Sequence, residues 1–327
     1  MKLEPIVWFE EVVKTYQTIA PFIHHTQVVT CPDLNEELGG KYLFKPESLQ
    51  ITGSFKVRGA LSAISRLSKE QLEHGVVAYS SGNHAQGVAH AAKLFKTPAI
   101  VVMPKDAPVK KIENAKALGA EVVFYDRSND IREEMAAEIA QEKNLSLIKP
   151  YDSLETIFGQ ATAAYEVIHD VNNPKIDNAI ICAGGGGLTA GSCIPLKHIN
   201  PECNIFTAEP KEWNDHEQSF KASKRVSIDT NRFGLCDGIL TPTPGEVPFA
   251  INQHYGVTGL SASDDMVCKA MSFAFNRLNL KLEPSGAVAL ACLLDNQEKF
   301  KGSRTLIILS GGNVDEKTFS DCLARAN

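Results

Sequence analysis

Short apolar runs alternate with longer segments of helical period along most of the chain. The apolar runs predict strands at residues 42–45, 76–80, 99–104, 121–125, 145–148, 178–183, 204–208 and 305–309. Between them, the helical period predicts helices that include residues 86–95, 109–118, 128–142 and 154–170. The strand runs are almost continuously apolar, which is typical of strands covered on both faces. The alternation therefore predicts an α/β protein with parallel sheets and right-handed crossovers.

Three polar or glycine-rich loops follow directly after predicted strands. They read SSGNH at residues 80–84, GGGGL at 184–188 and SGGN at 310–313. Open parallel sheets bind their ligands beyond the carboxyl ends of the strands. The sequence therefore predicts a ligand site formed by loops at these strand ends.

The run of four glycines at residues 184–187 favours an anion site. Glycine N–H groups can approach a phosphate closely, the following helix N-terminus adds a favourable dipole, and a tight turn alone would need one glycine. Residues 185–190 also match a dinucleotide-binding fingerprint, with Glu209 at the end of the next strand. A nicotinamide-dependent enzyme is the weaker alternative, because it would leave the other motifs without a role.

Lys56 lies in the segment TGSFKVRGA at residues 52–60, after a glycine-containing turn. Taken alone, such a lysine is equally well explained as a solvated surface charge. An amine that can form a Schiff base, an anion-binding loop and two polar loops are together the parts that a pyridoxal phosphate (PLP) site needs. Ser310 could bond the pyridine nitrogen of this cofactor. Ser81 or Asn83 could also serve simply as a helix cap.

Composition and charge restrict the class of protein. Of 327 residues, 43% are hydrophobic and 22% are charged, as is usual for a globular protein. The net charge of −6, without a basic stripe, argues against nucleic-acid binding. The uncharged run at residues 179–196 is rich in glycine and favours strand, loop and buried helix over a membrane span. Eight dispersed cysteines and no apolar secretory core favour a cytoplasmic protein with reduced thiols.

An acidic segment follows the predicted strand at residues 204–208. It contains Glu209, Glu212 and Asp215 around Trp213. Two carboxylates and a backbone carbonyl would suit a hard divalent cation. A solvated acidic loop explains the same residues, so the segment alone does not decide between these readings.

In combination, these motifs resemble those of the fold-type II PLP-dependent enzymes, specifically the serine/threonine ammonia-lyase (dehydratase) and serine racemase group. Residues 52–60, 80–85, 184–188 and 310–314 occur in the family's order and at its spacing. The resemblance implies two open, twisted parallel-sheet domains with PLP in the cleft between them. It further implies a large PLP-binding domain of residues 1–47 and 149–327, with residues 48–148 inserted as a small domain.

The resemblance also implies a role for each motif residue. Lys56 would hold PLP and act as the base at the substrate Cα, and Ser81 would lie on the opposite face as a second catalytic residue. Cofactor contacts are implied for Phe55, Lys56, Asn83, Gly184, Gly185, Gly186, Gly187, Leu188, Glu283 and Ser310. Substrate contacts are implied for Ser81, Gly82, Asn83 and His84. A divalent cation, Mg²⁺ or Ca²⁺, is implied at Glu209, the carbonyl of Trp213 and Asp215.

The implied activity is α,β-elimination on L-threonine or L-serine, which gives a 2-oxo acid and ammonia. Serine racemase and a 3-hydroxyaspartate or phenylserine dehydratase stay open, because elimination and racemisation would share one site. Tyr151 resembles the ammonia-lyases, whereas the loop at residues 241–246 matches neither subgroup and leaves the substrate open. A non-catalytic PLP-binding protein is disfavoured by Lys56, Ser81 and Ser310. A small hydroxy amino acid as substrate, a homodimer, and neither nucleic acid nor membrane as partner are expected.

Overall fold

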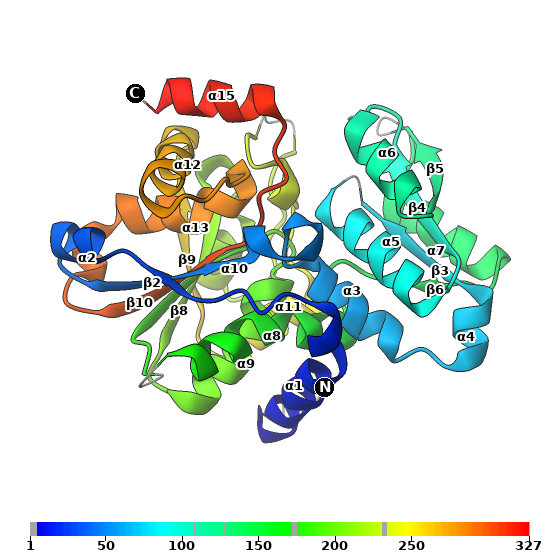
Figure 1. Ribbon diagram of the computed structural model, residues 1–327, viewed down its shortest axis with the longest axis horizontal. Coiled ribbons are helices and arrows are strands. Elements are labelled where there is room, and N and C mark those ends of the chain that lie inside the picture. The colour runs from blue at the N-terminus through cyan, green and yellow to red at the C-terminus, as the bar shows by residue number, and fades with distance from the viewer. Residues whose placement is uncertain are drawn as a thin grey trace.

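The computed structural model describes residues 5–80, 82–107, 109–126, 129–171, 175–230 and 234–326. These residues form a six-stranded and a four-stranded sheet, which lie to the left and to the right in Figure 1. The larger sheet has the order β1 (Val29–Thr30), β2 (Lys41–Pro46), β10 (Arg304–Leu309), β7 (Asn178–Cys182), β8 (Asn204–Pro210) and β9 (Thr258–Ala262). The smaller sheet has the order β5 (Glu121–Tyr125), β4 (Ala99–Pro104), β3 (Val76–Tyr79) and β6 (Ser146–Leu147).

Helices cover both sheets and fill most of the connections. The α-helices are α1 (Pro5–Ile19), α2 (Pro32–Leu38), α3 (Lys56–Ser65), α4 (Lys69–His74), α5 (Asn83–Phe95), α6 (Val109–Ala117), α7 (Arg132–Glu142), α8 (Leu154–Asp170), α9 (Gly187–Ile199), α10 (Asp215–Ala222), α11 (Glu246–His254), α12 (Asp264–Leu278), α13 (Pro284–Asp295), α14 (Gln297–Phe300) and α15 (Glu316–Arg325). Short 3₁₀-helices are η1 (Ala20–Phe22), η2 (Glu47–Leu49), η3 (Ile51–Gly53), η4 (Lys211–Trp213) and η5 (Asp237–Ile239). No helix in the described part of the chain is long and apolar enough to cross a membrane.

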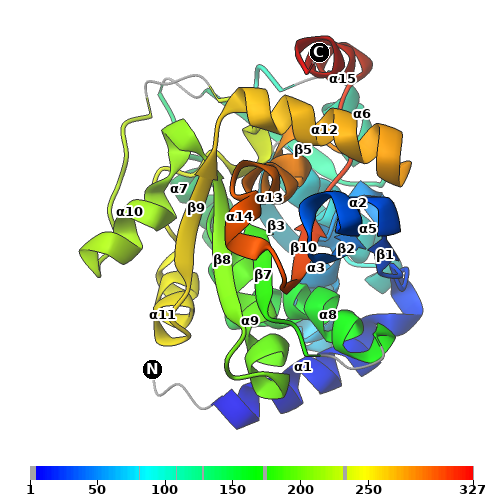
Figure 2. The same cartoon turned by 90° about the vertical axis from the view of Figure 1, so that its left-hand side faces the viewer.

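The six-stranded sheet is buried between two layers of helices. Helix α13 contacts β7, β8, β9 and β10, and α12 and α15 pack outside it. Helix α9 contacts β7 and β8, and α8 and α1 pack against α9. Figure 2 shows these layers, with α12 above the strands and α1 below them. Because both faces are covered, β7 and β10 can be apolar at nearly every position.

The four-stranded sheet is built in the same way around a second core. Helices α3 and α5 bury one face of β3 and β4, where Val57, Leu61, Val88 and Val101 are fully buried. Helix α7 covers the opposite face. All pairings within this sheet are parallel. In the larger sheet only β1 runs antiparallel to its neighbour, β2.

The predicted fold class is confirmed, and the differences lie at element ends and sheet edges. All eight predicted strands are present, although the strand at 145–148 shortens to β6. Two further strands, β1 and β9, were not predicted from the sequence. The helix predicted at 128–142 begins only at Arg132, and residue 128 lies outside the described residues. The predicted helix over 154–170 matches α8.

The expected division into two domains stays a prediction. Strands β3 to β6 all pair within the smaller sheet, and the strands before and after them in the chain all pair within the larger one. This segregation supports a division into residues 1–47 with 149–327 and an inserted segment of residues 48–148. Helix α3 is the main junction, because it contacts both α5 and α8.

A buried ion cluster joins α3 to the larger sheet. The Arg58 guanidinium donates to Glu47 at 2.7 and 2.8 Å and to Glu166 of α8 at 2.8 Å. Lys45 of β2 also binds Glu166, at 2.5 Å, and donates to the carbonyl of Thr26. All four charged side chains are fully buried, with two positive and two negative charges. Their mutual pairing offsets the desolvation cost that each charge alone would incur.

Replacing Arg58 with methionine should destabilise the protein strongly. The substitution leaves Glu47 and Glu166 buried without one of their counter-charges, so we expect the free energy of unfolding to fall by about 3–5 kcal/mol. Denaturant unfolding measures the change. Arg325→Met, which removes an exposed pair with Asp265, is the matched control and should cost no more than about 1 kcal/mol. A loss for Arg58→Met as small as that of the control would contradict this account of the cluster.

Candidate active site

One pocket brings together the start of α3 and the three loops predicted from the sequence. Lys56, Asn83, Gly185 and Ser310 all line it. Strand β3 belongs to the smaller sheet, whereas β7 and β10 belong to the larger one. The pocket therefore lies between the two sheets, beyond the carboxyl ends of their strands.

Lys56 is the first residue of α3 and places in this pocket an amine that can lose its proton. Its Nζ donates to the carbonyl of Pro150 at 3.0 Å and lies 5.1 Å from the centre of the Phe55 ring. Burial lowers the pKa of Lys56 to about 8, with a small opposing effect of Cys182. An amine with this pKa is partly neutral near physiological pH, as a nucleophile or base must be.

Backbone pairing with the loop after β10 fixes the segment that precedes Lys56. Phe55 N–H donates to the Ser310 carbonyl at 3.2 Å, and Gly312 N–H donates to the Gly53 carbonyl at 2.9 Å. Thr52 has the left-handed φ of 66°, and its carbonyl accepts from Asn313 Nδ2 at 2.7 Å. Two of the predicted motifs therefore hold each other in place.

The glycine loop leads from β7 into α9, a helix of 13 residues. Gly186 has a φ of +89°, which favours glycine. A Cβ at Gly186 would lie 2.4 Å from the His216 ring, and one at Gly185 would lie 2.2 Å from the Tyr151 ring. The amide N–H groups of Gly185 and Gly186 have no hydrogen-bond partner among the described residues. The loop therefore offers unpaired donors, together with the N-terminus of a helix, to an anion.

Asn83 is oriented by a hydrogen bond at each end of its side-chain amide. Its Nδ2 donates to Glu283 Oε1 at 2.6 Å, and its Oδ1 accepts from Asn313 Nδ2 at 2.8 Å. Glu283 precedes α13 and is 5% exposed, and burial raises its pKa to about 7. Both residues implied as cofactor contacts thus lie side by side in the pocket wall.

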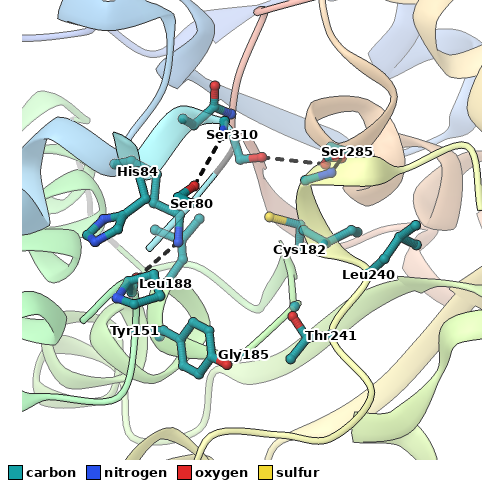
Figure 3. A pocket seen from close by; sticks show the side chains of 18 of the residues that line it. Ser80, His84, Tyr151, Cys182, Gly185, Leu188, Leu240, Thr241, Ser285 and Ser310 are labelled. Atoms are coloured by element: carbon teal, nitrogen blue, oxygen red, sulfur yellow. Dashed lines mark hydrogen bonds between the residues drawn. The ribbon is translucent and has the colours of Figure 1, made fainter. Parts of the chain in front are cut away.

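Small polar groups form the part of the pocket beside the larger sheet. Ser310 Oγ lies 3.5 Å from the carbonyl of Ser285, and the Cys182 sulfur is turned toward the same region (Figure 3). Burial raises the pKa of Cys182 to about 11, so its thiol stays protonated. Tyr151 and Thr241 lie beside Gly185 on the opposite side of this region (Figure 3).

In the described part of the loop after β3, neither Gly82 nor His84 offers a reactive side chain to the pocket. His84 Nε2 is 2.9 Å from the carbonyl of Ile148, which can only accept, so this nitrogen carries the proton. Burial, followed by the charge of Lys56, lowers the pKa of His84 to about 3. A Cβ at Gly82 would meet no atom within 4 Å, so the loop faces open space there. The predicted catalytic residue Ser81 lies outside the described residues.

Two cationic side chains reach the pocket from helices of the smaller sheet. Arg132 of α7 uses Nε to bind Glu133 at 2.8 Å, and its guanidinium carbon lies 5.8 Å from the Tyr79 ring centre. The remaining N–H groups of Arg132 have no hydrogen-bond partner in the described part of the chain. Lys111 of α6 binds Asp237 of η5 at 3.0 Å, so this pair connects the two sides of the pocket.

The acidic segment from the end of β8 to the start of α10 forms a second, separate candidate site. Glu209 and Asp215 are fully buried, and both carboxylate oxygens of Asp215 have no partner among the described residues. The two oxygens of Glu209 accept the backbone N–H groups of His216 and Glu217 at 2.8 and 2.9 Å. Burial and the neighbouring Asp215 raise the pKa of Glu209, and burial raises that of Asp215 to about 8.

This acidic pair fits a hard cation only if backbone oxygens complete the ligand set. In the part of the chain that the structure describes, no group of three or more His, Cys, Asp or Glu side chains could hold a metal. The carbonyl of Trp213, which the resemblance implies as a ligand, would be such a backbone oxygen. Without a cation, the raised pKa values mean that the pair holds protons instead.

The pocket residues also fit the implied cofactor. A partly neutral lysine amine suits an aldehyde, unpaired glycine amides at a helix N-terminus suit a phosphate, and the neutral Ser310 hydroxyl suits a ring nitrogen. These groups belong to one pocket, although the first and the last of them, Lys56 and Ser310, lie more than 250 residues apart in the chain. Each could thus contact a different part of a single PLP molecule.

Several residues in or behind the pocket were not singled out from the sequence. Arg132, Lys111 and Tyr79 give no local signal, because a charged or aromatic residue near a helix or strand end is common. Cys182 was interpreted only as a buried thiol. His216 and Asn252, which contact the glycine loop from α10 and α11, follow no motif, so only the fold shows their position.

Comparisons with known proteins agree with this site. A family model described as pyridoxal-phosphate dependent enzyme matches residues 19–311. Serine racemase of Schizosaccharomyces pombe is 38% identical over 317 residues, which are 97% of each chain. L-threo-3-hydroxyaspartate ammonia-lyase of Saccharomyces cerevisiae is 38% identical over 316 residues, 97% of this chain and 96% of that protein.

Solved structures share the fold over almost the whole chain. The processed form of threonine deaminase isoform 2 from Solanum lycopersicum superposes with a TM-score of 0.92 at 31% identity, and the match covers 99% of this chain and 95% of that one. The expected fold-type II architecture is therefore confirmed. The matches in sequence and structure agree, and the chain belongs to the family of pyridoxal-phosphate dependent enzymes.

Proposed function

We propose that this protein catalyses α,β-elimination on L-threonine or L-serine, which releases a 2-oxo acid and ammonia. The observation that carries the proposal is the Lys56 amine, which shares its pocket with the unpaired amides of the glycine loop. Relatives named serine racemase, L-threo-3-hydroxyaspartate ammonia-lyase and threonine deaminase support a β-hydroxy amino acid as the substrate class.

In the proposed reaction, Lys56 both holds the cofactor and moves the Cα proton. When bound, PLP supplies an electrophilic carbonyl for the substrate amine and a conjugated ring that withdraws electrons from Cα. Lys56 Nζ, released as a neutral amine, takes the proton from Cα, and its pKa of about 8 suits this role. Loss of the Cα proton and the β-hydroxyl removes one water, and hydrolysis of the resulting enamine gives the oxo acid and ammonia.

The other pocket residues would bind and orient. The amides of Gly184, Gly185, Gly186, Gly187 and Leu188 would hold the phosphate, and Phe55, Asn83 and Glu283 would contact the ring and its 3′-oxygen. Ser310 would face the ring nitrogen with a neutral hydroxyl, which favours prompt departure of the β-hydroxyl over a long-lived charge at Cα. The loop at residues 81–84 would hold the substrate carboxylate. The side chain of His84 already binds Ile148, so His84 would contribute its backbone N–H.

Racemisation at the same site depends on Ser81. A hydroxyl on the face of Cα opposite Lys56 could return a proton there and invert the configuration. The relatives named serine racemase keep this activity as a second candidate. Measuring D-serine formation alongside 2-oxo acid release from L-serine separates the two outcomes.

One feature of the pocket favours 3-hydroxyaspartate as a further substrate candidate. Apart from Nε, the N–H groups of Arg132 have no hydrogen-bond partner among the described residues, and Lys111, which is paired with Asp237, lines the pocket on the same side. A guanidinium of this kind would pair with a second carboxylate, but it offers nothing to the methyl group of threonine. The yeast relative carries this activity in its name.

We further propose a divalent cation, Mg²⁺ or Ca²⁺, at Glu209, the Trp213 carbonyl and Asp215. Two buried carboxylates that have no cationic partner among the described residues support this assignment. A cation would stabilise the turn between β8 and α10. This turn is connected to the glycine loop by His216, which binds both Glu209 and the Gly184 carbonyl.

A cytoplasmic homodimer is also proposed. It is supported by eight free cysteines and by the exposed apolar side chains Val7, Leu49 and Phe275.

Lys56→Ala should abolish both turnover and the visible absorbance of the bound cofactor. We expect 2-oxo acid release to fall by at least about 10³-fold, because the variant lacks the covalent anchor and the base. A coupled assay and an absorption spectrum of the PLP-treated protein measure the two effects. Lys93→Ala, on an exposed position of α5, is the control and should behave like the wild type. Turnover that survives the loss of Lys56 would refute the assignment.

Arg132→Met should change substrate preference if a second carboxylate binds in the pocket. We expect the kcat/KM ratio of L-threo-3-hydroxyaspartate over L-threonine to fall by about 10- to 100-fold, as loss of a charge-assisted hydrogen bond implies. Initial rates with both substrates give the ratio. Arg277→Met, which removes a surface contact with Glu37, is the control. An unchanged ratio would contradict binding of a second carboxylate by Arg132 and would favour threonine or serine as the substrate.

The acidic pair predicts a pH-dependent stability that a cation should remove. Asp215 has a pKa of about 8 in the fold against 3.8 in the unfolded chain, so the folded state binds more protons between these values. The free energy of unfolding of metal-free protein should therefore fall as pH rises through this range. Added Mg²⁺ or Ca²⁺ should raise the stability and flatten the slope. Thermal unfolding after exhaustive chelation tests both effects. Asp215→Asn should lose the response to the cation and reduce the pH dependence, of which the buried Glu209 keeps a part. A wild type indifferent to chelation would indicate a cation-free acidic pair.

A further inference from the structure

Three successive carbonyls of the glycine loop are held from outside the pocket. The Gly184 carbonyl lies 2.8 Å from His216 Nε2, and the Gly185 carbonyl accepts from Gly245 N–H at 3.0 Å. The Gly186 carbonyl accepts from Asn252 Nδ2 at 3.5 Å. These donors come from α10, the turn before α11, and α11. The carbonyls of the first three of the four glycines are therefore bound by elements that follow the loop in the chain.

Holding a carbonyl also fixes the direction of the next N–H group. A trans peptide is planar, so its C=O and its N–H point in opposite directions. The carbonyls of Gly184 and Gly185 point to the bracing elements, so the N–H groups of Gly185 and Gly186 point the other way. Neither of these N–H groups has a partner among the described residues, and both glycines line the pocket.

Among the described residues, His216 is the only ring side chain that forms a hydrogen bond with this loop. The donor atom of this hydrogen bond can be assigned. A carbonyl can only accept, so His216 Nε2 carries the hydrogen and Nδ1 is the unprotonated nitrogen. His216 is fully buried, and Nδ1 has no hydrogen-bond partner in the described part of the chain. The ring thus makes one directed contact, and that contact is with the loop.

The position of His216 is itself fixed from two sides. Its backbone N–H donates to Glu209 Oε1 at 2.8 Å, at the start of α10. Its ring packs against the Gly186 backbone so closely that a Cβ there would lie 2.4 Å from His216 Cε1. The imidazole therefore has little freedom to leave the Gly184 carbonyl.

We propose that His216 is a positioning residue for cofactor phosphate binding: it holds the 184–185 peptide so that Gly185 N–H is aimed at a phosphate oxygen. The imidazole does not touch the cofactor and acts only through the peptide. This role rests on the proposed assignment of the glycine loop to the phosphate. It predicts that loss of the His216 donor weakens the contact with the phosphate and leaves contacts with the rest of the cofactor intact.

Two nearly isosteric variants test this role by equilibrium binding to the apoprotein. Glutamine can place an N–H near the position of Nε2, whereas methionine has a similar length and no donor. We expect His216→Met to bind PLP about tenfold more weakly than the wild type and pyridoxal, which lacks the phosphate, with unchanged affinity. His216→Gln should recover most of the PLP affinity. Titration followed by visible absorbance gives all the constants, and His254→Met, at an exposed position of α11, is the control.

The outcomes separate the role of His216 from the assignment of the loop. A wild type that binds pyridoxal as tightly as PLP would remove the phosphate assignment. A wild type that prefers PLP, with the same preference in His216→Met, would overturn only the positioning role. Equal weakening for PLP and pyridoxal would also overturn it, because it indicates general damage to the pocket. His216→Leu, smaller and also without a donor, replaces the methionine variant if that variant does not fold.

Discussion

The fully buried guanidinium of Arg58 is the constraint on which the placement of the reactive lysine depends. A charge in this position is tolerated only where carboxylates surround it, so α3 can dock only with Arg58 between Glu47 and Glu166. Lys56 lies two residues earlier on the same helix and follows it into the pocket. Since α3 also packs into the core of the smaller sheet, the cluster sets the relation of the two sheets around the site.

Within the pocket, peptide groups provide much of the polarity and side chains mainly orient them. The glycine loop is held by His216, Gly245 and Asn252, and the segment before Lys56 is held by the loop after β10. Glu209 binds the backbone of His216, so the acidic pair and the glycine loop are two hydrogen bonds apart. A change at the acidic pair can thus reach the pocket through fixed contacts without any large movement.

The sequence was sufficient to predict the strands and loops that a short stretch of residues identifies. Continuous apolar runs predicted β3, β4 and β7 because both faces of these strands are covered, and glycine-rich loops marked the strand ends. Strand β9 (TGLSA) was missed because its sequence lacks an apolar run. Leu260 is its one large apolar residue, and glycine, serine and alanine surround it, as an edge strand tolerates. Arg132 and His216 could not be predicted, since their roles come from positions set by packing between distant segments.

The contact between Lys111 and Asp237 has a consequence for the motion of the molecule. It connects α6 to η5 across the pocket, and both partners keep some exposure to solvent, 23% and 61%. A partly exposed ion pair contributes about 1 kcal/mol or less, which is a population ratio of less than about tenfold. Breaking of this ion pair is therefore a frequent thermal fluctuation, and it becomes more frequent as ionic strength rises.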